Sequence, residues 1–203
     1  HVGHSAMACM IKALFFVVII KSSPYSSRFS RDKMNGTQMS ASKIFEELIG
    51  RPIASPYKEA LLARETLLQQ SLNAYQAVLT PLETGLWSHA LRAALAMRIV
   101  TLTQSLGAAS GIRKYAATTE FDGWLKDVAQ ATPVTHTQAP VWLDAVLAYT
   151  DTLTLYPQKA TNSLIDSLKQ KNVDDADCVR LAELVATLSY QIRLIVGFQA
   201  LQA

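Results

Sequence analysis

The segment that most constrains the fold begins near Asp174 and runs almost to the end of the chain. Asp175 and Asp177 stand where a helix would begin, and their charge is favourable at the positive end of a helix dipole. The apolar residues that follow cover more than one helix face: Leu181, Leu184, Val185, Leu188, Ile192, Ile195 and Val196. Such a helix is usually central to a bundle or buried at a subunit interface. The segment therefore predicts a helical protein whose last helix is enclosed by other helices or by a second subunit.

Two earlier helices are predicted from their start and stop signals. A short helix over residues 43–49 is followed closely by a glycine and a proline, which end it. Ser55 and Pro56 predict an N-cap and a first-turn proline for a helix that runs toward Thr80 and stops before Pro81. The expected buried stripe of this long helix is Leu61, Leu68, Leu72, Tyr75 and Leu79.

The next helix is expected after Ser88, a good N-cap residue, with one apolar face formed by Leu91, Leu95, Ile99 and Leu102. Gly107 and Gly111 indicate a break near its end, and Thr161 is expected to cap a later helix. Three more helices are predicted before the last helix, over residues 120–130, 141–154 and 162–171. We therefore predict an all-α helical bundle that forms one domain over residues 40–203.

The positive charge of the chain lies outside this domain. The 203 residues carry a net charge of +3, yet residues 1–33 hold five basic side chains and one acidic one. The remainder holds 14 basic and 15 acidic side chains, so the domain has no bulk charge suited to a polyanion. This balance argues against nucleic-acid binding.

Residues 1–33 have a composition foreign to the rest of the chain. Their apolar run, residues 13–20, is too short to span a bilayer as a helix, which needs about 20 residues. It could be the central region of a signal peptide that begins at Met7 or Met10. The alternative, which we favour, is a translated extension ahead of a working start at Met34 or Met39. We expect this extension to be disordered or processed, and we expect no membrane span.

Two cysteines, Cys9 and Cys178, stand far apart in different contexts. They make neither a disulfide framework nor a zinc-binding pattern, so we expect no metal and no cofactor. Reduced thiols of this kind are typical of a cytoplasmic protein.

Three stretches of the domain resemble one known family. Residues 43–81 are similar to a leader segment, residues 85–117 to a helix-turn-helix, and residues 152–197 include a further match at the last helix. Together they resemble the carboxymuconolactone decarboxylase/alkylhydroperoxidase (AhpD-like) family. The resemblance implies an AhpD-like helical bundle, and it identifies the fold better than the substrate.

The same resemblance places the family's thiol relay on residues that cannot perform it. Active peroxidases of the family carry a glutamate on the first helix of the motif, then C-x-x-C and a histidine on the second. Here residues 103–111 read TQSLGAASG, without cysteine or histidine, and Leu91 stands near the glutamate position. A peroxidase thiol needs a lowered pKa, a resolving partner and a proton relay, so dithiol peroxidase activity is not expected.

Three residues remain as candidates for a site. His89 follows an N-cap in the former catalytic region, and Glu83 precedes that helix, although both fit solvated positions. Arg193 lies in the apolar run SYQIRLIVGF at a position where the family commonly has arginine. Burial there would require an acidic partner across helices or subunits, or an anionic ligand. Cys178, without a partner, is expected to be a small core-facing residue.

Two functions follow from these observations. The first is a noncatalytic helical partner or ligand-binding subunit that has lost the thiol relay, with an active alkylhydroperoxidase-like protein as a possible companion. The alternative is a thiol-independent enzyme of the decarboxylase type, acting by proton transfer on a small carboxylic acid or lactone. A pocket on which His89 and Arg193 converge would favour this enzyme. In either case the apolar last helix predicts a homo-oligomer, a dimer or a trimer-based assembly.

Overall fold

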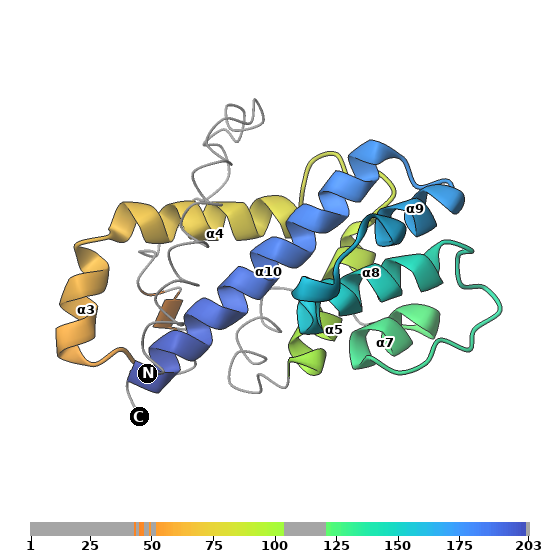
Figure 1. Cartoon of the computed structure of the whole chain (residues 1–203). Helices are drawn as coiled ribbons and strands as arrows, with labels where there is room; N and C mark the ends of the chain where they lie inside the picture. The colour runs from red at the N-terminus through yellow and green to blue at the C-terminus, as the bar shows by residue number, and fades with distance from the viewer. Residues whose placement is uncertain (1–42, 44, 47–48, 50–51, 104–120, 202–203) are drawn as a thin grey trace. The chain divides into compact units, whose positions relative to one another are not determined.

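The computed structural model describes residues 43, 45, 46, 49, 52–103 and 121–201, all within the unit Ser40–Ala203. Across these residues the regular structure is entirely helical, which confirms the all-α prediction (Figure 1). The extension over residues 1–33 and the glycines Gly107 and Gly111 lie outside the described residues. The described positions between 43 and 49 are helical, and Phe45 and Ile49 among them are buried.

The long helix expected from Ser55 to Thr80 is in fact two helices. They are α3, Ser55–Leu62, and α4, Glu65–Leu79, and Arg64 between them has a non-helical backbone with φ −123° and ψ 26°. The break turns α3 away from the axis of α4 (Figure 1). Ser55 is the first helical residue rather than the N-cap, which is Ala54. The predicted buried stripe is confirmed in full.

Helix α5, His89–Leu102, lies at the centre of the fold. Ser88 caps it as predicted, because the Ser88 hydroxyl accepts a hydrogen bond of 3.2 Å from the Leu91 N–H. Residues 91–100 are all buried, so the expectation of a single buried face was too narrow. The helix contacts α4 and α10 as well as α7, Gly123–Gln130, and α8, Leu143–Leu155. The small side chains at Ala93, Ala94 and Ala96 suit a helix enclosed on all sides.

The helices after α5 agree closely with the prediction. The chain continues through α7 and α8, a 3-10 turn at Pro157–Lys159 and α9, Asn162–Gln170. Helix α7 starts later than expected and ends at Gln130, and the C-cap residue Ala131 has a left-handed backbone with φ 55°. Thr161 occupies the N-cap position of α9 but makes no capping bond, since its hydroxyl lies 2.7 Å from that of Ser163.

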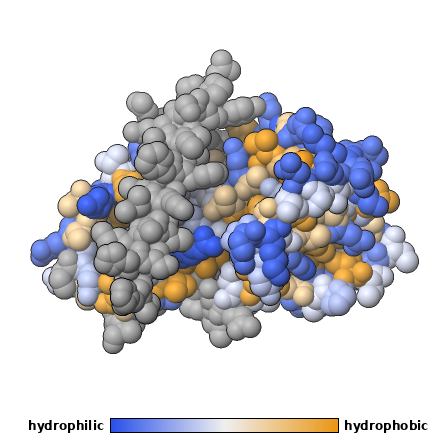
Figure 2. Space-filling model, in the orientation of Figure 1, coloured by the Kyte–Doolittle hydropathy of each residue, from blue (hydrophilic) through white to orange (hydrophobic). Residues whose placement is uncertain are grey.

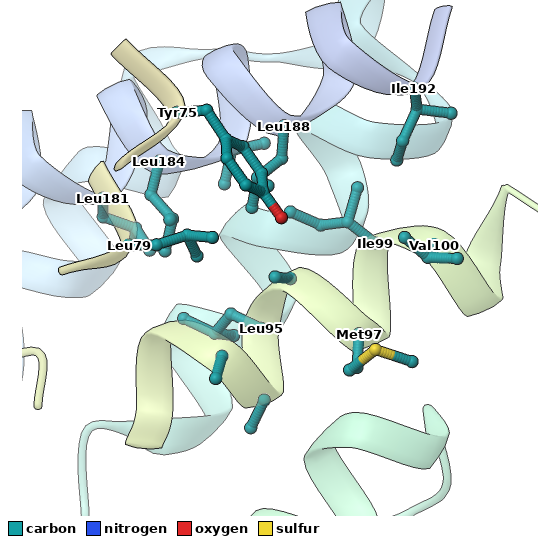
Figure 3. Close-up of a cluster of buried hydrophobic side chains, with 14 of the residues drawn as sticks. Tyr75, Leu79, Leu95, Met97, Ile99, Val100, Leu181, Leu184, Leu188 and Ile192 are labelled. Atoms are coloured by element: carbon teal, nitrogen blue, oxygen red, sulfur yellow. The ribbon is translucent and has the colours of Figure 1, made fainter. Parts of the chain in front are cut away.

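Helix α10, Asp175–Leu201, crosses the other helices and packs on α4, α5, α8 and α9 (Figure 1). Its start is capped by Asp174, whose carboxylate accepts a 2.7 Å bond from the Asp177 N–H. Figure 3 shows one α10 face meeting side chains of α4 and α5 in the core. The labelled members of this cluster are Tyr75, Leu79, Leu95, Met97, Ile99, Val100, Leu181, Leu184, Leu188 and Ile192.

Helix α10 also leaves apolar side chains on the surface. Val179, Val196 and Leu201 are exposed, whereas Ile195 is fully buried within the subunit. In the part of the surface that Figure 2 colours, apolar and hydrophilic residues are interspersed. By length and composition alone α10 could cross a membrane, but a core helix of a soluble protein meets the same criterion. This feature is therefore weak evidence for a span.

Candidate functional site

The three residues proposed from sequence do not form one site. His89, at the start of α5, is exposed, and its Nε2 lies 2.9 Å from the carbonyl oxygen of Pro81. Glu83 is exposed in the loop before α5. Arg193 is exposed on α10, so the interpretation of a buried arginine was wrong. Helical periodicity explains this outcome, because the residue projects outward while its neighbours Ile192 and Ile195 face the core.

The distance between His89 and Arg193 also argues against a shared pocket. The indole Nε1 of Trp87, close to His89 in the chain, donates a 2.8 Å bond to the carbonyl oxygen of Asp177 in the first turn of α10. Arg193 lies 16 residues further along α10. At a rise of about 1.5 Å per residue, these two points of α10 are about 24 Å apart. His89 and Arg193 therefore do not converge.

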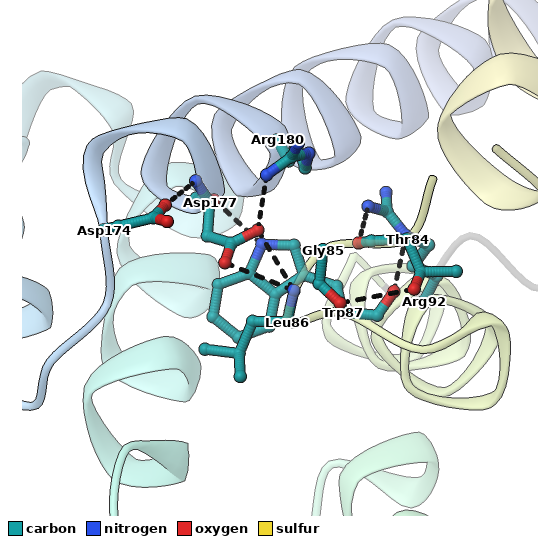
Figure 4. A network of polar contacts seen from close by, with 8 residues as sticks. All are labelled: Thr84, Gly85, Leu86, Trp87, Arg92, Asp174, Asp177 and Arg180. Atoms are coloured by element: carbon teal, nitrogen blue, oxygen red, sulfur yellow. Dashed lines mark hydrogen bonds and ion pairs between the residues drawn. The ribbon is translucent and has the colours of Figure 1, made fainter. Parts of the chain in front are cut away.

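A buried arginine that the sequence interpretation overlooked holds the loop between α4 and α5. The Arg92 guanidinium donates to three backbone carbonyl oxygens. They are those of Thr84 at 2.9 Å and Trp87 at 2.8 Å, both drawn in Figure 4, and that of Val78 at 2.8 Å. Burial and the nearby charge of Arg180 lower the pKa of Arg92. Because one of its acceptors lies at the carboxyl end of α4, the charge also complements that helix dipole. Arg92 is thus a structural residue.

Asp177, at the start of α10, also holds the loop between α4 and α5. Its carboxylate accepts from the Leu86 N–H at 3.1 Å and from Arg180 Nη1 at 2.8 Å (Figure 4). Gly85 has φ +59°, and a Cβ on it would lie 2.2 Å from Asp177 Oδ1. A side chain at position 85 would therefore meet both backbone strain and a clash. The carboxylate is occupied by the protein's own donors and is structural.

Cys178 lies beside this network and faces the core, which confirms the interpretation made from sequence. Burial raises the pKa of its thiol, and the carboxylate of Asp175 acts in the same direction. Tyr149 is also buried, and the pKa of its hydroxyl is raised by burial and by Cys178. A thiol in these surroundings stays protonated at neutral pH and is a poor nucleophile. Cys9 and positions 104–111 of the expected relay lie outside the described residues.

An ion pair joins α5 to α8. Arg98 forms a two-pronged ion pair with Asp151, with Nε to Oδ1 and Nη2 to Oδ2 both at 2.6 Å. The Arg98 side chain is 9% exposed and that of Asp151 is 30% exposed, so the pair reaches from the core to the surface. Arg98 Nη1, the hydroxyl oxygens of Thr150, Thr154 and Ser189, and Gln191 Oε1 are buried and make no hydrogen bond.

The sequence contained a signal for the buried Arg98. Arg98 interrupts the apolar run AALAMRIV, the same kind of pattern that drew attention to Arg193. The pattern indicates a buried charge in one case and an exposed charge in the other, and only the three-dimensional packing separates them. No group of three metal-ligating side chains occurs in the described part of the chain. Neither a known family model nor a curated protein matches the chain.

Proposed function

We propose that this protein is an AhpD-like helical subunit without thiol chemistry, which acts as a noncatalytic partner or ligand-binding subunit. The observation that carries the proposal is the state of Cys178. A peroxidatic thiol must be ionised and accessible, and must have a resolving partner. Cys178 is buried, its pKa is raised, and the structure describes no second thiol in the domain.

The ligand-binding part of the proposal draws on the unpartnered buried atoms of Arg98, Thr150 and Thr154, because buried polar groups in folded proteins nearly always have hydrogen-bond partners. The proton-transfer enzyme has less support, because His89 and Arg193, which would have to cooperate, lie far apart and are both exposed. The suggested companion, an active alkylhydroperoxidase-like protein, stays part of the proposal.

A peroxide-reduction assay tests this function. Hydrogen peroxide consumption in the presence of dithiothreitol should equal the protein-free rate for the full chain and for the Cys178→Ala and Cys9→Ala variants. A substantial rate in the full chain that is lost in either variant would overturn the proposal, because it would show a one-thiol mechanism.

A further inference from the structure

We draw no further inference here: the strongest candidate, the exposed apolar surface of Leu82 and Leu86 on the loop that Arg92 and Asp177 hold between α4 and α5, carries no proposal, because nothing in the described part of the structure shows what covers it.

Discussion

Two arginines buried in the same helix satisfy their charges in different ways. Arg92 donates to three carbonyl oxygens of the loop before α5, whereas Arg98 binds a carboxylate on α8. Neither solution is visible in the sequence, because the partners lie on other elements or are backbone atoms. The burial of Arg92 was therefore hard to predict from the sequence. At position 193 the error was the reverse, because an arginine in an apolar run suggested burial and the residue is exposed.

Gly85 is the residue at which the loop tolerates least change. Gly85→Ala should lower the free energy of unfolding by about 2 kcal/mol or more, since φ +59° strains an alanine and its Cβ would clash with Asp177. Gly197→Ala is the control, because nothing lies within 4 Å of the added Cβ, and it should stabilise α10 by about 0.5–1 kcal/mol. Urea unfolding of both variants measures the difference. Equal stabilities would show that the loop conformation is not the one described.

The pH dependence of stability should report on Cys178. Burial raises the pKa of its thiol above the ordinary value of 9.0, so the folded state keeps the proton longer than the unfolded state does. The stabilising contribution is complete below the unfolded pKa and is lost as the pH rises through the folded one. Unfolding free energy should therefore fall more steeply as the pH rises above about 9 in the wild type than in Cys178→Ala. Parallel pH profiles would contradict this, even though Tyr149 adds a similar effect at higher pH.

At the scale of helices, the sequence predicted which segments are helical better than it predicted where a helix breaks or which of its faces are buried. The helices over residues 143–155, 162–170 and 175–201 agree with their punctuation, because caps and prolines act locally. The break between α3 and α4 could not be predicted in this way. Leu61 and Leu68 are seven residues apart and would share a face in one continuous helix as well, and neither glycine nor proline marks the junction. The burial of α5 on all sides could not be predicted either, because alanine is common on both exposed and buried helix faces.

Helix capping separates two residues that looked alike in the sequence. Ser88→Ala removes an observed capping bond to Leu91 and should destabilise the domain by about 1 kcal/mol. Thr161→Ala changes an N-cap residue whose side chain makes no such bond, so it should cost less than half as much. Chemical unfolding of the two variants side by side is the measurement. A larger loss of unfolding free energy for Thr161→Ala than for Ser88→Ala would contradict this difference between the two caps.

At the scale of the whole molecule, the position of residues on α10 changes how self-association must be tested. Ile195 was a candidate for the subunit interface, yet it is fully buried within its own subunit, so Ile195→Asp should unfold the domain. Its neighbour Val196 is 42% exposed on the same helix. If the chain forms the predicted dimer or trimer-based assembly through the outer face of α10, Val196→Asp should lower the sedimentation mass at micromolar concentration and keep the helical circular dichroism. A monomeric wild type would contradict self-association, and an intact Val196→Asp assembly would place the interface on another face.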